Sequence, residues 1–254
     1  MTVIDLRRYS AVIFETDGVL TDTARIHAAA WKRALDDFLR HRPDLAADQA
    51  RPFHIRDDYL RHLDGRPRLD GARSFLASRG VVLPPGPEAD QTLAELGDTK
   101  DTLFLAEIRR HGVAAFPAAM AVVRELRRHG ARLAAISPSR NCAEILARAG
   151  MGDMFDARVD GVDAAERGLP AMPDPAMPLR AAGVLAAAPH ECVVVAATEP
   201  ALRAAQQGRF GLVVALRPDE RPAPGTGADW VVGDLAELRV SGRVPLVVHG
   251  DPPI

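Results

Sequence analysis

Short apolar runs alternate with amphipathic segments along the second half of the chain. The apolar runs have the length of buried strands and lie at residues 132–137, 157–159, 192–196, 211–216 and 229–232. The segments between them repeat apolar residues every three or four positions, as helices do, at residues 117–129, 141–149, 174–187 and 200–207. Strands that alternate with helices predict parallel βαβ units with right-handed crossovers, and therefore an α/β fold.

Another buried-type strand is predicted near the N-terminus, at residues 11–14. Glu15 and Asp17 follow it, one residue apart, and Gly18 then permits a sharp turn because it has no Cβ atom. Open parallel sheets bind their ligands in the crevice at the carboxyl ends of the strands. We therefore expect both carboxylates to face one crevice.

The segment between this strand and the alternating half is predicted to be helical. Apolar spacing favours helices at residues 22–40, 57–63, 70–79 and 93–112. Breaks separate them at residues 64–68, a turn that carries Arg66 and Arg68, and at residues 82–87, which are rich in proline.

Composition narrows the class of protein. The 254 residues suffice for one large domain or for a core with a smaller unit, and the net charge of −2 gives no reason to expect nucleic acid or a membrane surface as partner. No apolar run is long enough to span a bilayer. Residues 1–10 lack the apolar core that a signal sequence requires, and two cysteines make no disulfide framework. We expect a cytoplasmic protein.

Residues 10–23, SAVIFETDGVLTDT, resemble motif I of the haloacid dehalogenase superfamily, and His27, Ala30 and Trp31 fit the helix that follows it in the β-phosphoglucomutase-like branch. The resemblance implies a Rossmann-like parallel sheet with an α-helical cap inserted after the first strand. It divides the chain into a core at residues 1–22 and 113–240, a cap at residues 23–112 and a tail at residues 241–254.

The resemblance also assigns roles to the two acids. In this family the first acid of the motif is the aspartate nucleophile that becomes an aspartyl-phosphate, and this chain has Glu15 there. The extra methylene moves the carboxylate by about 1 Å, a misplacement that can cost roughly a hundredfold in rate. Glu15 is either a poor nucleophile or metal ligand, or a relic acid in the crevice. Asp17 keeps the acid/base position.

Other positions match the phosphate-binding parts of the family. Ser137 corresponds to the hydroxyl of motif II that contacts a phosphoryl oxygen. Ser139, Arg140 and Asn141 match the run that holds the non-reacting phosphate of the substrate, although the same run is also typical of a helix N-cap. Arg68 matches the arginine of the substrate-specificity loop, and His27 keeps the pattern at the cap hinge.

The remaining catalytic positions lack the charged side chains that the family has there. Met172 replaces the motif III lysine, and Ala196 and Ala197 replace the acids of motif IV that hold Mg²⁺. The only lysines, Lys32 and Lys100, lie in the predicted cap, so we expect the balancing cation to be absent unless an arginine substitutes for it. Glu15 and Asp17 alone make a weak metal site, and Mg²⁺ is expected only with residual activity.

Three functional hypotheses follow. The first is a catalytically impaired relative that retains a pocket for a phosphosugar or phosphometabolite, with a binding, regulatory or scaffold role beside a carbohydrate-handling enzyme. The alternative is an active hydrolase or β-phosphoglucomutase-like enzyme with altered motifs. The third is a structural partner whose crevice has collapsed over Met172 and the two alanines. The sequence leaves enzymatic activity and oligomeric state open.

Overall fold

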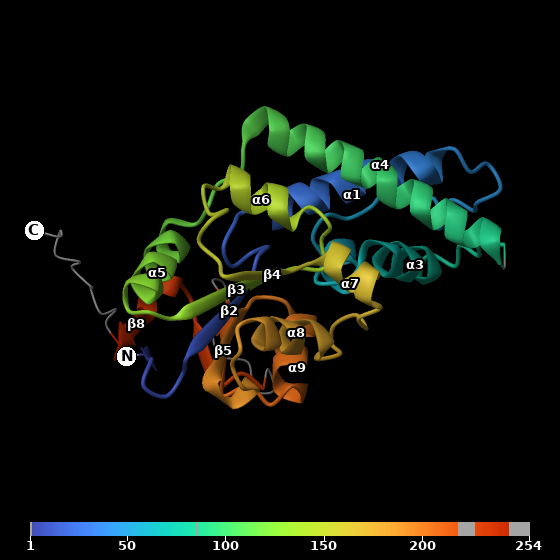
Figure 1. The fold of residues 1–254 in the computed structure, drawn as a ribbon. Coiled ribbons are helices and arrows are strands. Elements are labelled where there is room, and N and C mark those ends of the chain that lie inside the picture. Colours follow the sequence, from blue (N-terminus) through green and yellow to red (C-terminus); the bar gives the residue numbers. More distant parts are fainter. Residues whose placement is uncertain (1, 85, 218–226, 244–254) are drawn as a thin grey trace, which may run out of the picture.

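A six-stranded parallel sheet runs through the computed structural model, which describes residues 2–84, 86–217 and 227–243 (Figure 1). Its strands are β2 (Ala11–Glu15), β3 (Arg132–Ile136), β4 (Ala157–Val159), β5 (Cys192–Ala196), β6 (Leu212–Leu216) and β7 (Trp230–Val232). The order across the sheet is β4-β3-β2-β5-β6-β7. The chain therefore leaves β2 in one direction to form β3 and β4, and returns to its other side to form β5.

The central strand β2 is buried on both faces, as its uninterrupted apolar run predicted. Val12 and Phe14 pack into one apolar cluster with α5 (Pro117–Arg128) and α6 (Cys142–Arg148). Ala11 and Ile13 pack into a second cluster with α8 (Ala176–Val184) and α9 (Glu199–Gln207). Because alternate residues of a strand point to opposite faces, these two clusters place helices on both sides of the sheet.

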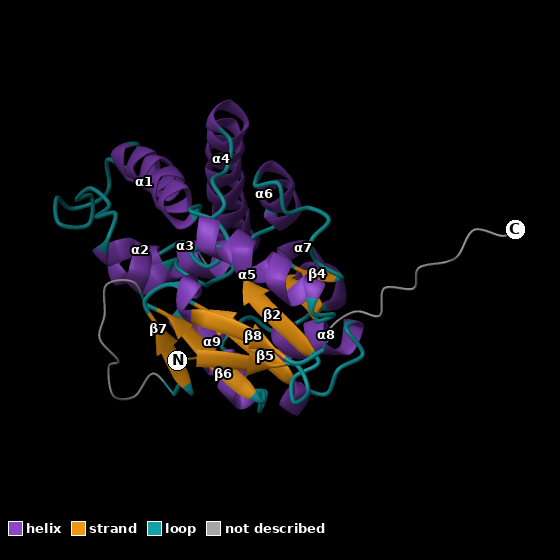
Figure 2. Cartoon of the chain, turned by 90° about the vertical axis from the view of Figure 1, so that its left-hand side faces the viewer, coloured by secondary structure: helices purple, strands orange, loops and turns teal. Residues whose placement is uncertain are grey.

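Helices α1 (Ala24–Arg40), α2 (Asp57–His62), α3 (Arg68–Ser78) and α4 (Pro87–His111) lie between β2 and β3 in the chain. We call residues 24–111 the helical insertion. It has an apolar core of its own, which includes Trp31, Phe75 and Leu93. A smaller cluster around Phe104 and Ile145 joins it to α6. Figure 2 shows the insertion above one end of the sheet.

The predicted α/β fold class is confirmed, and so are the predicted strands and helices, with shifts at their ends. Four features were not predicted: the parallel pair of β1 (Thr2–Asp5) with β8 (Leu238–Ser241), helix α7 (Gly161–Arg167), and two 3₁₀ helices at Pro189–Glu191 and Leu235–Glu237. Helix α4 also begins earlier than predicted, at Pro87. The cap and core boundaries remain a prediction, and the strand-like part of the tail lies outside the described residues.

None of the helices in the described ranges has the length and apolar character needed to cross a bilayer.

Candidate functional site

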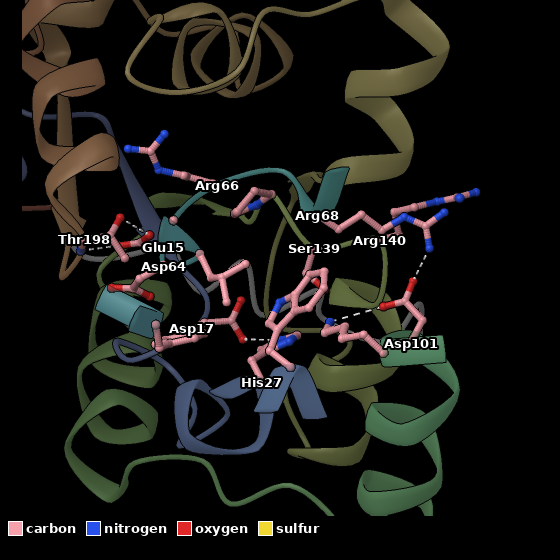
Figure 3. Close-up of a pocket in the computed structure, with 16 residues that line it drawn as sticks. Glu15, Asp17, His27, Asp64, Arg66, Arg68, Asp101, Ser139, Arg140 and Thr198 are labelled. Atoms are coloured by element: carbon pink, nitrogen blue, oxygen red, sulfur yellow. Dashed lines mark hydrogen bonds and ion pairs between the residues drawn. The ribbon is translucent and has the colours of Figure 1, made fainter. Parts of the chain in front are cut away.

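The carboxyl ends of β2, β3 and β5 meet the helical insertion around a narrow cavity of about 50 Å³ (Figure 3). This is the crevice predicted for the carboxylates of Glu15 and Asp17, since β3 and β5 flank β2 at the point where the strand order reverses. The charged side chains around the cavity are four acids, Glu15, Asp17, Asp64 and Asp101, and four bases, Arg66, Arg68, Lys100 and Arg140. We call this space the narrow cavity.

The Glu15 carboxylate is bound by the start of helix α9. Its Oε2 atom accepts hydrogen bonds from the backbone N–H groups of Ala197 (2.8 Å) and Thr198 (3.0 Å), and its Oε1 atom accepts one from the Thr198 hydroxyl (2.6 Å). Only 2% of the residue is exposed. Burial raises the pKa of Glu15 to about 7, although the bonds from Thr198 and Ala197 act in the opposite direction. Both carboxylate oxygens are thus already committed to neighbouring residues.

This raised pKa predicts a pH effect that Glu15→Gln should remove. An unfolded glutamate ionises near 4.5. Between pH 4.5 and 7 the folded state therefore binds more protons than the unfolded state, and this group makes the unfolding free energy fall as pH rises. As pH rises from 4.5 to 7, the unfolding free energy of Glu15→Gln should therefore increase relative to that of wild type by up to about 3 kcal/mol. Denaturant unfolding at several pH values checks this, with exposed Glu166→Gln as control. Parallel curves for wild type and Glu15→Gln would contradict the raised pKa.

Asp17 is held in its ionised form. Its carboxylate accepts hydrogen bonds from the hydroxyls of Ser137 (2.9 Å) and Thr23, and Oδ1 lies 3.4 Å from Nε2 of His27. Burial alone would raise the pKa of Asp17, but its interaction with His27 and these hydrogen bonds outweigh the burial and lower the pKa to about 2. In this arrangement Asp17 is a poor proton donor near neutral pH, because an efficient general acid needs a pKa near the working pH.

A lysine does reach the site, which corrects the expectation that neither lysine would. Helix α4 packs along α1, and this brings Lys100 beside His27 although the two are far apart in the sequence. The rings of His27 and Phe104 stack with their centres 3.9 Å apart, and the Lys100 ammonium lies 4.8 Å from the centre of the Phe104 ring. Burial lowers the pKa of both His27 and Lys100. Lys100 forms an ion pair with Asp101 at 3.2 Å, so the narrow cavity keeps a buried ammonium group, supplied by the insertion rather than by the core.

Asp101 joins the insertion to the core across the narrow cavity. It accepts a short hydrogen bond from Arg68 (2.7 Å) and another from Lys100 (3.2 Å). Its Oδ1 atom also accepts from the side-chain amide of Asn141 (3.2 Å). Arg68 makes a further ion pair with Asp98 at 2.9 Å. Arg68 lines the cavity as expected, whereas Asn141 is not among its lining residues and acts as a link to α4.

Of the other residues predicted to bind phosphate, some line the narrow cavity and one does not. Ser139 and Arg140 line the narrow cavity. Ser137 is fully buried, and its hydroxyl donates to Asp17 while accepting from the backbone N–H of Ser139. It is absent from the cavity lining and instead positions Asp17 and the 138–140 turn. No ion pair forms at Arg140 within the described part of the chain, which leaves its guanidinium available to a ligand.

The three altered motif positions are apolar parts of the fold. Met172 and Ala196 are buried in the cluster that packs against α8 and α9. Ala197 contributes its backbone N–H to Glu15. Mg²⁺, which the family implies, requires several oxygen ligands in octahedral geometry. The oxygens of Glu15 already accept three hydrogen bonds, and no cluster of three or more histidine, cysteine or acidic residues suited to a metal exists among the described residues. This donor set does not fit a magnesium site.

Sequence reasoning missed several lining residues. Asp64 closes the cavity from the turn at residues 64–68, and burial followed by the charge of Asp17 raises its pKa to about 6. Its position in a turn with two arginines was the available signal. Neither Thr198 nor Lys100 offered such a signal. Thr198 acts partly through its backbone N–H, and the packing of α4 against α1 is what brings Lys100 to the cavity.

Comparison with known proteins gives a consistent result. A model of the haloacid dehalogenase-like hydrolase family matches residues 9–207. A β-phosphoglucomutase from Mycobacterium bovis is 35% identical over 237 residues, which cover 90% of each chain. A Mycobacterium tuberculosis protein described as an uncharacterized glycosyl hydrolase is 39% identical over 242 residues; the match covers 93% of this chain but only 18% of that longer protein.

Solved structures share the fold. The crystal structure of CbbY from Rhodobacter sphaeroides in complex with xylulose-(1,5)-bisphosphate superposes with a TM-score of 0.72 at 22% identity, covering 91% of this chain and 97% of that one. A β-phosphoglucomutase from Clostridium difficile gives a TM-score of 0.70 at 18% identity, over 90% of this chain and 92% of the other. At this level of identity the likeness concerns the fold alone.

Proposed function

We propose that this chain, which belongs to the haloacid dehalogenase-like hydrolase family and to its β-phosphoglucomutase-like branch, binds a phosphorylated sugar or metabolite and has lost most of its phosphoryl-transfer activity. The proposal rests on the hydrogen bonding of the Glu15 carboxylate. Its carboxylate accepts three hydrogen bonds from Ala197 and Thr198, at the place where the family positions a nucleophile beside Mg²⁺. A nucleophile held in this way must give up hydrogen bonds before it can attack, and the residues around it do not fit the metal that would neutralise the phosphoryl charge.

Binding is supported by the cations that remain. Arg68, Lys100 and Arg140 face the narrow cavity together with the hydroxyl-bearing Ser139. Guanidinium groups form short, charge-assisted hydrogen bonds to phosphate oxygens, often two at a time. The relatives named β-phosphoglucomutase, and the neighbour solved with a sugar bisphosphate, support the choice of a phosphosugar as the ligand class.

Ligand entry requires the helical insertion to move. The narrow cavity of about 50 Å³ is far smaller than the roughly 300–1,000 Å³ of ordinary ligand sites. The insertion closes it through the turn at residues 64–68 and through Asp101 on α4. Movement of the turn away from Thr198, and of Asp101 away from Asn141, would open the site. The return of the insertion would then enclose the bound ligand.

The biological role that fits is binding or regulation within carbohydrate metabolism. The chain matches 18% of a longer mycobacterial protein described as a glycosyl hydrolase, so a related unit occurs within a larger chain of that description. We therefore place this protein beside a carbohydrate-handling enzyme as a sensor or scaffold for a phosphorylated ligand.

One observation favours the alternative, an active enzyme with altered motifs. Asp17, Ser137 and the buried Lys100 keep an acid, a hydroxyl and a cation within one small region. A slow, metal-independent hydrolysis assisted by these groups is the second candidate function.

Thermal-shift titration tests the binding half of the proposal. Glucose 6-phosphate or glucose 1-phosphate should raise the unfolding temperature, since a ligand of the folded state stabilises by about 2.7 kcal/mol at a concentration of 100 Kd. Glucose without phosphate should give no shift. A phosphate-binding pocket would be refuted if all three sugars shifted the unfolding temperature equally, or if none of them shifted it.

A further inference from the structure

The carboxylate of Asp101 is held by three donors at the wall of the narrow cavity. Its Oδ1 atom accepts hydrogen bonds from the side-chain amide of Asn141 and from the Lys100 ammonium, each at 3.2 Å. Its Oδ2 atom accepts one from a guanidinium N–H of Arg68 at 2.7 Å. Because 16% of the Asp101 side chain is exposed, water screens these contacts only in part. Both oxygens of this carboxylate are therefore bound by side chains of the site.

Two of these donors occupy positions that the sequence assigned to a phosphate. Asn141 ends the run that matches the site of the non-reacting phosphate, and Arg68 matches the arginine of the substrate-specificity loop. Carboxylates and phosphates present pairs of oxygens to N–H donors in a similar way, and guanidinium groups bind both. In Figure 3 the side chains of Arg68 and Arg140 lie on the same side of the cavity as Asp101. The carboxylate of Asp101 thus engages donors that a phosphate would need.

Helix α4 is shaped for the contact with Arg68. Gly97 is buried and lies one turn before Asp101 on the same helix. A Cβ atom at Gly97 would lie 3.2 Å from both Cδ and Nε of Arg68, closer than side chains ordinarily pack. The absence of that atom lets the Arg68 side chain lie along α4, where its guanidinium reaches Asp98 and Asp101. The pairing of Arg68 with Asp101 is thus built into the packing of the insertion.

We propose that Asp101 is an internal competitor for the phosphate of the ligand and so sets how tightly the site binds it. In the ligand-free protein its carboxylate engages Arg68, Lys100 and Asn141, and an incoming phosphate must take donors from it. The movement of the insertion that opens the site separates Asp101 from Asn141 and frees a donor on the core side. A dianionic phosphate ester then replaces the carboxylate, because it offers more oxygens and a larger charge to the same donors. This inference rests on the proposed function and adds the regulation of its phosphate site.

Calorimetric titration of the full chain with glucose 6-phosphate tests the proposal, because removal of a competitor and removal of a binding residue change the affinity in opposite directions. Asp101→Asn keeps the shape of the side chain but removes its charge. It should increase the affinity about tenfold, the effect of freeing one charge-assisted contact. Asp90→Asn is the matched control, since Asp90 is an acid of the same helix that is paired with Arg73 at 3.0 Å and does not line the narrow cavity. Its substitution should leave the affinity within about twofold of wild type.

Arg68→Ala supplies the second measurement, because it removes a donor for which Asp101 and the ligand compete. In the Arg68→Ala background, Asp101→Asn should increase the affinity by less than about threefold, since residues that share a partner do not act additively. A purely structural link between the insertion and the core predicts a different pattern. Asp101→Asn would then lower the unfolding temperature and leave the affinity unchanged or reduced. The melting curve of each variant shows whether the titrated protein is folded.

Three results separate this inference from the proposed function. An increased affinity in Asp101→Asn that largely disappears in the Arg68→Ala background supports the inference, and so does binding that appears only in Asp101→Asn. Wild-type binding that Asp101→Asn leaves unchanged or weakens would overturn the inference while the proposed function stands. Absence of binding in both proteins would overturn both, since no phosphate site would then exist for Asp101 to block.

Discussion

Arg140→Ala is expected to lower the affinity for a sugar phosphate by about 10- to 100-fold, as the loss of hydrogen bonds to a charged group predicts. Arg140 lines the narrow cavity and makes no ion pair among the described residues, so it gives up no protein contact when it binds phosphate. Arg68→Ala should have a smaller effect. Its guanidinium is already paired with Asp98 and Asp101, and these contacts compete with the ligand. Isothermal titration with glucose 6-phosphate measures both effects.

Arg73→Ala is the matched control for these variants. Arg73 is an arginine of the same helix as Arg68 and is paired with Asp90 at 3.0 Å, but it does not line the narrow cavity. Its substitution should leave the affinity unchanged. Wild-type affinity in Arg140→Ala and Arg68→Ala together would show that the phosphate does not bind in the narrow cavity.

The second prediction concerns recovered activity. Combining Glu15→Asp, Met172→Lys, Ala196→Glu and Ala197→Asp is expected to raise Mg²⁺-dependent phosphatase turnover by roughly a hundredfold or more, the scale of a single well-placed electrostatic contact. The shorter aspartate would release the N–H groups of Ala197 and Thr198, and the other three substitutions restore the residue types that the family uses for its metal ligands and its cation. Turnover of a sugar phosphate is compared in Mg²⁺ and in EDTA.

A control variant distinguishes recovered phosphatase activity from a general effect of the added charges. The same three core substitutions combined with Glu15→Asn lack a nucleophile and should stay at the wild-type rate. Met172 and Ala196 are buried, so the melting curve of each variant shows whether the added charges are tolerated. A folded fourfold variant with no gain over the Glu15→Asn control would mean that the loss of activity has another cause.

Local patterns were enough to predict most of the fold. The apolar run at residues 11–14 identified the central strand because every side chain of that strand is buried, and Gly18 adopts a positive φ of 77° as the expected turn requires. The pair of β1 and β8 was missed for a physical reason. Both strands are four residues long, and their partners come from opposite ends of the chain, so neither shows a periodic signal.

The site was predictable only where side chains follow strand ends. Glu15 and Asp17 face one cavity because β2 ends there. The state of Glu15 was not predictable, since two of its three donors are backbone N–H groups that every non-proline residue has. Lys100 was equally hidden, because the packing of α4 against α1 brings it to the cavity and no motif marks it.

The most direct test of impaired phosphoryl transfer is the turnover of a panel of sugar phosphates by the wild-type chain and by Glu15→Ala, each with and without Mg²⁺. Both proteins are expected to release phosphate at the same low rate, and Mg²⁺ is expected to change neither rate. Wild-type turnover that requires Mg²⁺ and disappears in Glu15→Ala would contradict this expectation and would identify the chain as an active metal-dependent enzyme.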